Sequence, residues 1–406
     1  MDSNMEEWKV YKIGDICSNV CSGGTPTSTH SEYYDGDIPW LNTKEICFNR
    51  IHKTERNITE EGLNNSSAKW IPENTVIVAM YGATAGKTAI AKIPLTTNQA
   101  CCNLTINSEI ADYRFVYYYL LNKYSVICSL ANGGAQQNLN AQIIKDFKIN
   151  LPPTLEQTRI ASFLSSLDDK IEINKRINDN LEQQAQTLFK SWFVDFEPFK
   201  DQPFEESELG MIPKGWRVGK LGDICSYSTI RISIDNLSPK TYFSTENMLP
   251  NKMGAVEAST LPQVGMTTGC EPFDVLVSNI RPYFKKILRV DSICGCSSDV
   301  MCFHSTDSKY RVFLYRTLYD DSFFSYIMAG SKGTKMPRGD KQQIMKYPIV
   351  LPHESILEHF SNCVEPMLLM VSSFKQESSR LAQLRDTLLP KLMSGELKIN
   401  DVEKNL

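Results

Sequence analysis

Two short polar loops carry the side chains of this chain that are best suited to chemistry. The first loop reads Gly133-Gly134-Ala135-Gln136-Gln137-Asn138, and the second reads Lys332-Gly333-Thr334-Lys335-Met336-Pro337-Arg338. Gln, Asn, Arg and Lys are the residues that read base edges bidentately or clamp phosphates. Either loop alone is more typical of a solvent-facing turn. Because both loops shortly precede a Gln-x-Ile segment, their matching positions favour a shared role in binding nucleic acid.

A third loop looks like a nucleotide-binding motif, but its spacing is wrong. Gly82-Ala83-Thr84-Ala85-Gly86-Lys87-Thr88 has three residues between its glycines. A phosphate-binding loop needs four, so that its backbone N–H groups wrap around the phosphates. The counterpart in the second half, Arg281-Pro282-Tyr283-Phe284-Lys285-Lys286, has no glycine. Motifs of serine hydrolases, zinc proteases and dinucleotide-binding enzymes are missing too, so we expect a chain that is not an enzyme.

The elements that must position these loops occur twice. Trp8-Lys9-Val10 with Ile13–Ser18 returns as Trp216-Arg217-Val218 with Leu221–Ser226, at an offset of 208 residues. The segment from Gln142 to Pro152 returns as Gln342 to Pro352, at an offset of 200 residues. Solenoid repeats are far shorter than this. The pattern indicates a duplicated domain, and hence two similar sites in one chain.

Each half divides into a globule and a long helix. Residues 1–150 and 210–350 share short apolar runs broken by Gly, Pro and Asn, with one helical stretch near Tyr113–Tyr124 and another near Tyr310–Tyr319. This texture predicts mixed α/β globules. Capping boxes then begin the helices at Thr154-x-x-Gln157 and at Ser355-x-x-Glu358. A first helix of roughly 38 residues would be about 57 Å long.

Both helices carry a narrow apolar stripe of the kind seen in coiled coils. Asn174 and Asn178 interrupt the first stripe, and a buried Asn commonly fixes the register of such a seam. Pro366 predicts a kink or split in the second helix, and Pro390 predicts its end. We expect the two helices to pack against each other through Leu164, Leu167, Ile171, Leu181, Leu188, Leu381, Leu384 and Leu388.

Composition narrows the class of protein. The net charge is −4, yet Val275–Val290 holds four basic residues and no acidic one. Ser322–Gly339 holds three basic residues and again no acidic one. Two local basic surfaces would suit a DNA reader whose remaining surface meets protein. No apolar run approaches the ~20 residues of a membrane span. The twelve cysteines include no Cys-x-x-Cys pair, so we expect reduced thiols, no structural metal and a cytoplasmic location.

Nearly the whole chain resembles the specificity subunit of type I restriction–modification systems. The resemblance is carried by an ordered set of segments: Gly23-Gly24-Thr25-Pro26, Ile38-Pro39-Trp40, Tyr81–Lys87, Leu151-Pro152-Pro153, Ala161–Ile171, Phe189–Phe193, Ile212–Trp216, Ser278–Tyr283, Gly333–Asp340 and Leu388–Gly395. No single segment decides the match. The set and its internal duplication are specific together.

The resemblance implies an α+β fold with two similar target recognition domains, related by a pseudo-twofold arrangement and joined by an antiparallel two-helix coiled coil. Its segments would be 1–150 (first recognition domain), 151–197 (first spacer helix), 198–215 (linker), 216–352 (second recognition domain), 353–398 (second spacer helix) and 399–406 (tail). Each domain would read half of a split sequence in double-stranded DNA, with half-sites on the order of one helical turn (~34–36 Å) apart.

The resemblance also implies where the chemistry resides. Two modification subunits would dock on the helices and methylate adenine with S-adenosylmethionine. Restriction subunits would join that complex, hydrolyse ATP with Mg²⁺ and cleave DNA. This chain would hold no cofactor and contact no membrane.

DNA contact carries over residue by residue onto both halves. The residues are Tyr81, Lys87, Gln136, Gln137 and Asn138 in the first half, and Arg281, Tyr283, Lys285, Lys335 and Arg338 in the second. Packing in the core is the alternative for the two tyrosines. Met336 and Pro337 stand where the first half has Gln136 and Gln137, which suggests two different half-sites.

Two other classes of protein stay open at this point. A stand-alone DNA-binding or scaffold protein would use the coiled coil to dimerise and would bind DNA specifically without a methyltransferase. A fused nuclease or NTPase would turn over ATP by itself. The subunit hypothesis instead predicts poor solubility or weak binding of the isolated chain, because its apolar helix flanks need a partner.

Overall fold

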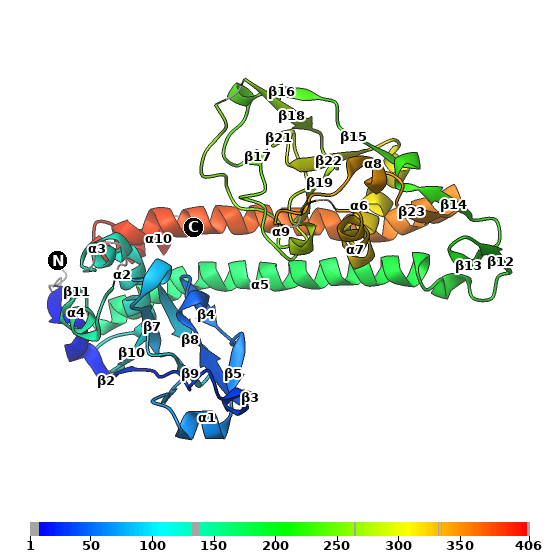
Figure 1. The fold of residues 1–406 in the computed structure, drawn as a ribbon. Helices are drawn as coiled ribbons and strands as arrows, with labels where there is room; N and C mark the ends of the chain where they lie inside the picture. Colours follow the sequence, from blue (N-terminus) through cyan, green and yellow to red (C-terminus); the bar gives the residue numbers. More distant parts are fainter. Residues whose placement is uncertain (1–7, 132–137, 264, 332, 334, 404–406) are drawn as a thin grey trace. The chain divides into compact units, whose positions relative to one another are not determined.

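The computed structural model describes residues 8–131, 138–263, 265–331, 333 and 335–403 (Figure 1). Contacts divide the chain into two compact units. Unit 1 comprises residues 1–172 and 378–406, and unit 2 comprises residues 173–377. Each unit therefore contains one globule and a part of both long helices.

The globule of unit 1 is built on two sheets. The larger has the order β2(Cys17–Ser22)-β10(Cys101–Ile106)-β7(Val76–Ala79)-β8(Thr88–Ala91)-β4(Asn49–Ile51). The smaller has the order β5(Arg56–Ile58)-β3(Tyr34–Leu41)-β9(Leu95–Thr97)-β6(Trp70–Ile71). The described residues of this globule also form the short helices α1(Glu60–Asn64), α2(Tyr113–Asn122), α3(Tyr124–Ser129) and α4(Ala141–Asp146). Strand β7 and the buried face of α2 belong to the same apolar core.

The globule of unit 2 repeats this topology. Its first sheet, β15(Cys225–Tyr227)-β22(Val300–Ser305)-β19(Val275–Ser278)-β20(Ile287–Arg289), matches β2-β10-β7-β8. In its second sheet, β16(Arg231–Ser233)-β18(Met266–Cys270)-β21(Cys294–Cys296)-β17(Tyr242–Phe243), the parallel pair β17–β21 matches β3–β9. Helices α6(Arg311–Tyr319), α7(Asp321–Ala329) and α8(Lys341–Ile344) follow. The predicted mixed α/β globules are confirmed.

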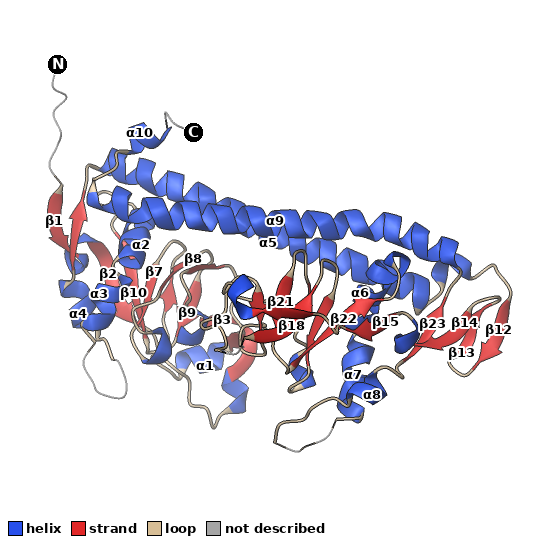
Figure 2. Cartoon of the chain, turned by 90° about the horizontal axis from the view of Figure 1, so that it is seen from above, coloured by secondary structure: helices blue, strands red, loops and turns tan. Residues whose placement is uncertain are grey.

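The repeated segments pair with one another inside each unit, which explains why both recur. Strand β1(Lys9–Lys12) is antiparallel to β11(Lys148–Leu151), with Lys9 opposite Leu151. Strand β14(Arg217–Lys220) is antiparallel to β23(Pro348–Leu351), with Arg217 opposite Leu351. The register is the same in both ladders. Each ladder closes its globule at the point where the chain enters a long helix (Figure 2).

The long helices are α5(Thr154–Phe193) and α9(Glu354–Ser394). In unit 1 the first turns of α5 share a core with the last turns of α9, through Leu164 and Leu392 among others. In unit 2 the last turns of α5 share a core with the first turns of α9, for example through Phe189 and Phe360. The two helices therefore run antiparallel, and the predicted packing of one against the other is confirmed.

The split predicted at Pro366 and the helix end predicted at Pro390 are both wrong. Pro366 does not split the helix, because the exposed proline lies between Val364 and Leu368, whose burial in the core holds the helix together across it. Pro390 does not end it either, since α9 continues to Ser394 with Leu392 and Met393 buried in unit 1. Burial of these side chains outweighs the ~3 kcal/mol that an interior proline costs.

The seam residues are buried to different degrees. Leu164 and Leu167 are buried, whereas Ile171, Leu181, Leu188, Leu381, Leu384 and Leu388 are only partly covered. Asn174 is fully buried, and its Nδ2 donates to Glu377 Oε2 on α9 at 2.7 Å. Asn178 is buried as well. The amides thus lie inside the seam as predicted, and a hydrogen bond of this kind favours one register.

The segments predicted as linker and tail both have regular structure. Residues 198–215 include the hairpin β12(Phe204–Ser207)–β13(Gly210–Pro213), and Phe199 and Ile212 join the core of unit 2. Residues 399–403 form α10(Ile399–Glu403), whose Ile399 and Val402 are buried in unit 1. Apolar side chains in both segments account for this, because their burial removes them from water.

Candidate nucleic-acid interface

An isolated β-bridge in each unit joins the residue just after a central strand, β7 or β19, to a predicted site residue from a distant loop. In unit 1 Tyr81 pairs with Asn138, and in unit 2 Ile280 pairs with Arg338. The backbone around both bridges matches: Met80 N donates to Ala100 O at 2.8 Å, and Asn279 N donates to Asp299 O at 2.9 Å. We call these two places the recognition edges, defined by Tyr81–Lys87 with Asn138, and by Ile280–Lys286 with Arg338.

Each recognition edge has a tight loop with the same backbone conformation. In unit 1 the left-handed positions are Gly82 and Gly86, with φ of 73° and 82°. In unit 2 the corresponding positions are Arg281 and Lys285, both with φ of 49°. Glycine adopts this conformation freely, whereas a residue with a Cβ pays for it. Unit 2 thus accepts backbone strain to place two cations where unit 1 has none, a feature that is common at functional sites.

The tyrosines of the recognition edges are exposed. Tyr81 keeps 42% of its surface and Tyr283 keeps 48%. Phe284, which the sequence analysis did not single out, is also exposed and lies with its ring 4.7 Å from that of Tyr283. Core packing, the alternative for the two tyrosines, is therefore excluded. Exposed aromatic rings beside cations can stack on bases or sugars.

Lys285 of the unit 2 loop is held by a carboxylate beside the loop. Asp321 accepts from Lys252 at 2.7 Å and pairs with Lys285 at 3.0 Å. The hydrogen bond from Lys252 holds the pKa of Asp321 below its ordinary value, although burial opposes this. Burial lowers the pKa of Lys286, whose Nζ donates to Thr245 O at 2.5 Å. Sequence reasoning missed Asp321 and Lys252, because they lie far from the loop along the chain.

The remaining predicted DNA contacts have different outcomes. Lys335 and Asn138 are exposed, and Lys87 is half-buried with its Nζ 3.7 Å from Cys47 Sγ. Gln136 and Gln137 lie outside the described residues. Arg338 pairs with Asp299 at 3.2 Å. The bases or phosphates that any of them touches stay a prediction.

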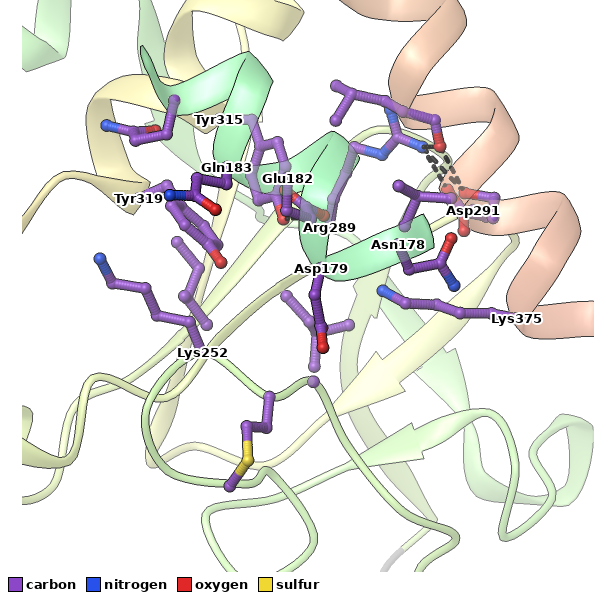
Figure 3. A pocket seen from close by; sticks show the side chains of 18 of the residues that line it. Asn178, Asp179, Glu182, Gln183, Lys252, Arg289, Asp291, Tyr315, Tyr319 and Lys375 are labelled. Atoms are coloured by element: carbon purple, nitrogen blue, oxygen red, sulfur yellow. Dashed lines mark hydrogen bonds and ion pairs between the residues drawn. The ribbon is translucent and has the colours of Figure 1, made fainter. Parts of the chain in front are cut away.

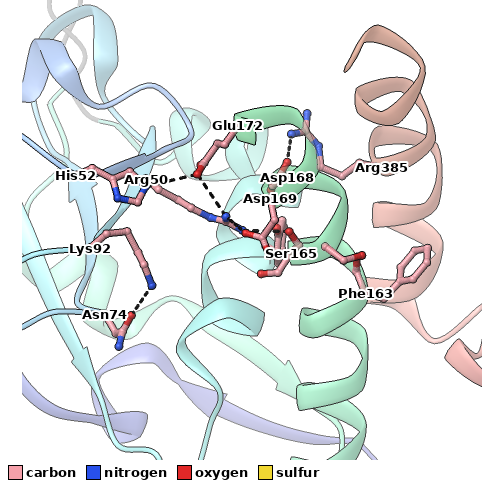
Figure 4. Close-up of polar contacts among 12 residues, drawn as sticks. Arg50, His52, Asn74, Lys92, Phe163, Ser165, Asp168, Asp169, Glu172 and Arg385 are labelled. Atoms are coloured by element: carbon pink, nitrogen blue, oxygen red, sulfur yellow. Dashed lines mark hydrogen bonds and ion pairs between the residues drawn. The ribbon is translucent and has the colours of Figure 1, made fainter. Parts of the chain in front are cut away.

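One cation of the predicted basic surface has a structural role instead. The Arg289 side chain is only 7% exposed, and its Nη2 donates to Leu368 O at 3.3 Å and to Ser372 Oγ at 3.0 Å on α9. In unit 1 Arg50 uses the same arrangement, with Nη2 donating to Ser165 O at 3.3 Å and Nη1 donating to the Asp169 carboxylate on α5 (Figure 4). An arginine clasp thus attaches each globule to the long helix that follows it.

Other polar contacts reinforce this attachment in unit 1. The Tyr118 hydroxyl donates to Asp168 Oδ2 at 2.5 Å, and Arg385 Nη1 on α9 donates to Asp168 Oδ1 at 2.6 Å. Burial raises the pKa of Tyr118, so the hydroxyl keeps its proton and remains a donor. Figure 4 shows Asp168 and Arg385 meeting between the two helices. Globule and helices are therefore bound together rather than loosely tethered.

Unit 2 contains a pocket of about 410 Å³ between its globule and its parts of α5 and α9 (Figure 3). Three carboxylates and three cations line it: Asp179, Glu182 and Asp291, with Lys252, Arg289 and Lys375. Because the charges balance, the lining selects neither an anion nor a cation. Within the part of the chain that the structure describes, no group of three or more His, Cys, Asp or Glu side chains could hold a metal ion, and no helix is long and apolar enough to cross a membrane.

Comparison with known proteins identifies the family. A family model described as the type I restriction modification DNA specificity domain matches residues 5–183. The type I restriction enzyme MjaIX specificity subunit of Methanocaldococcus jannaschii is 30% identical, over 98% of this chain and 95% of its own length. The chain belongs to the type I restriction enzyme specificity subunits. Such a subunit is a non-catalytic recognition component, and its partners are DNA and the other subunits of the complex.

Other relatives of this specificity subunit show how far the likeness extends. The HindI specificity subunit of Haemophilus influenzae is 22% identical over 97% of this chain and 100% of its own length. A crystal structure of the type I restriction–modification system S subunit from M. genitalium has a TM-score of 0.59 at 18% identity, and 97% of each chain is covered. The α+β fold with two long helices is therefore that of the family.

Proposed function

We propose that this specificity subunit recognises a bipartite DNA target, one half-site through each recognition edge, and directs methylation and cleavage to it. The observation that carries the proposal is the pair of equivalent bridges, Tyr81–Asn138 and Ile280–Arg338. The backbone is the same in both units, while the side chains differ in charge and hydrogen-bonding pattern. Two edges of one design with different side chains suit two half-sites of different sequence.

The long helices would set the unread gap between the half-sites. Support comes from the arginine clasps of Arg50 and Arg289, which attach each globule to a helix. A helix fixes distance at 1.5 Å per residue, so a clasped globule would have a defined place along it. The gap would then be constant from one target to the next.

The same helices would dock two modification subunits. Exposed apolar side chains on them support this: Leu155 and Ile173 on α5, and Leu369 and Met370 on α9. Apolar side chains that stay exposed in the isolated chain are typical of surfaces that a partner covers. We place S-adenosylmethionine on those subunits, ATP and Mg²⁺ on the restriction subunits, and the whole complex in the cytoplasm with its DNA.

Co-expression with the modification subunit from the same locus tests the proposal. The purified complex should contain two modification subunits per specificity subunit. Mapping of N6-methyladenine at base resolution should show a split motif with two defined ends and a fixed gap. A stable complex that adds no methylation would contradict the reading role. Specific binding by the purified chain alone, with no complex formed, would favour the stand-alone DNA-binding protein.

Exchange of one globule separates the two readers. Residues 1–150 replaced by the matching segment of a relative with a different target should change one half-site and leave the other unchanged. The reciprocal exchange of residues 216–352 is the matched control and should change only the other half-site. Changes at both ends from either exchange would contradict the assignment of one reader to each globule.

A further inference from the structure

Asn138 and Arg338 occupy the same backbone position in the two recognition edges. Leu139 N donates to Met80 O at 2.8 Å beside Asn138. Arg338 is held on both sides, because Arg281 N donates to Pro337 O at 2.9 Å and Gly339 N donates to Asn279 O at 3.4 Å. Both side chains are exposed. A side chain on a hydrogen-bonded bridge residue has a better defined position than one on a loop without backbone hydrogen bonds.

The neighbour of this position differs between the units. Matching hydrogen bonds, from Met80 N to Ala100 O and from Asn279 N to Asp299 O, make Asp299 the counterpart of Ala100. Asp299 Oδ1 lies 3.2 Å from Arg338 Nη2, with side-chain exposures of 37% and 54%. An ion pair this exposed contributes little to folding. Its effect is to hold one edge of the guanidinium while the other N–H groups stay available to a ligand.

We propose that Asn138 and Arg338 are the base-reading residues of the two half-sites, that Asn138 reads an adenine and Arg338 a guanine in the major groove, and that Asp299 positions Arg338. The inference rests on the proposed function and adds to it the chemistry of each half-site. Arg presents two parallel donors that match guanine O6 and N7. Asn presents one donor and one acceptor, which match adenine N7 and N6.

The longer side chain, Arg338, has a carboxylate neighbour, whereas the shorter side chain, Asn138, has Ala100 at the matching position. Arginine has several rotatable bonds, so a free guanidinium loses considerable entropy when it orders on a base. The Asp299 carboxylate restricts that motion before DNA arrives. Asparagine has two side-chain torsions and needs no such partner, which is consistent with Ala100 at the matching position.

Base analogues test the proposal with the complete methyltransferase complex, once its motif has been mapped. Each guanine of the half-site read by unit 2 is replaced in turn by 7-deazaguanine, which lacks the N7 acceptor. The wild-type complex should lose affinity at one guanine, by less than the about 5- to 150-fold of a complete bidentate contact, because O6 still accepts a hydrogen bond. Arg338→Ala loses both hydrogen bonds and should lose the full factor on natural DNA, and replacing this guanine by 7-deazaguanine should not weaken binding by the variant any further. Inosine at this guanine, which keeps O6 and N7, should bind normally.

The matching experiment for unit 1 uses 7-deazaadenine and Asn138→Ala. The wild-type complex should lose affinity when one adenine of the other half-site is replaced by 7-deazaadenine. The same replacement should not change the affinity of Asn138→Ala. Asp299→Asn tests the positioning role: it should weaken discrimination at the guanine read by Arg338 without weakening binding to unrelated DNA, because the lost charge is negative. Lys335→Ala is the contrasting variant, an exposed cation near Arg338 that should weaken binding to all sequences alike and reduce the salt dependence.

The outcomes separate this inference from the proposed function. If 7-deazaguanine lowers the affinity of Arg338→Ala by the same factor as that of wild type at every guanine, Arg338 does not read N7 and the inference is wrong. If 7-deazaadenine lowers the affinity of Asn138→Ala as much as that of wild type at every adenine, Asn138 does not read an adenine. A complex with no sequence preference would instead overturn the proposed function itself.

Discussion

The guanidinium of Arg316, fully buried on α6, donates from Nη2 to Oε2 of Glu182 on α5 at 2.6 Å. The rings of Tyr315 and Tyr319 lie 4.3 Å and 5.0 Å from its central carbon. Both residues of the pair belong to unit 2. A charge enclosed in this way stays inside the protein only because its partner is present. The pair therefore fastens the second recognition globule to the end of the first long helix.

Loss of either partner should destabilise unit 2 strongly. Glu182→Gln leaves the fully buried charge of Arg316 without its partner and should lower the free energy of unfolding by about 3–5 kcal/mol. Arg316→Met should cost less, because Glu182 is partly exposed. The double variant Glu182→Leu/Arg316→Met should lose less than the sum of the single losses, because no buried charge remains. Denaturant unfolding of the chain measures this. Lys240→Ala is the control, since its ion pair with Glu257 is exposed at 3.5 Å and should contribute less than about 1 kcal/mol.

Arg281→Gly should separate stability from DNA affinity. Arg281 has a left-handed backbone, and Gly82 occupies the matching place in unit 1. Removal of the Cβ relieves about 1–2 kcal/mol of strain, partly offset by the ~0.5–1 kcal/mol of extra freedom that glycine has when unfolded. We expect an unchanged or slightly higher melting temperature together with weaker DNA binding and a shallower salt dependence. Arg281→Ala, which loses the charge and keeps the strain, is the control. Equal DNA affinity in wild type and both variants would remove Arg281 from the interface.

Asp321 should make unit 2 sensitive to acid. Its pKa lies below the ordinary value of 3.8 because Lys252 and Lys285 favour the carboxylate. The stabilisation is thus present above about pH 4 and is lost as the pH falls through the lower pKa of the folded state. Asp321→Asn should be less stable than wild type at pH 6, and the difference should shrink as the pH falls below about 4. The control is Asp201→Asn, at an exposed aspartate. Its stability relative to wild type should not depend on pH in this way. A constant difference at all pH values would mean that the carboxylate charge is not what stabilises this loop.

Shortening both long helices should change the gap and nothing else. Removal of seven residues from each, around Asn174 and Glu377, takes out about two turns, or ~10.5 Å. The gap should shrink by about three base pairs at ~3.4 Å each, with both half-sites unchanged in the methylation map. Removal of seven residues from α5 alone is the comparison and should impair assembly, because the seam loses its register. Altered half-sites in the double deletion would argue against a spacer role.

Much of the architecture was predictable because it depends on local pattern. The apolar stripe of the first helix predicts α5 to within a few residues of its observed bounds, Thr154–Phe193. The capping box expected at Thr154 does not form, because the Gln157 side chain accepts a hydrogen bond from Asp112 N and donates one to Pro152 O instead. Proline was a poorer guide. Pro366 and Pro390 lie inside α9, since burial on both sides of a proline outweighs its local cost, and burial depends on partners distant in the sequence.

The candidate site divides in the same way. The duplication, the two polar loops and the wrong spacing of the phosphate-loop motif can be read from the order of the residues, because offsets and spacings are defined along the chain. The folded chain was needed to establish that Asn138 and Arg338 are equivalent, that Asp299 lies beside Arg338, and that Arg289 contacts α9 instead of facing solvent. Hydrogen bonds between strands and the burial of a charge are relations between residues far apart in the chain, so their outcome appears only once the chain has folded.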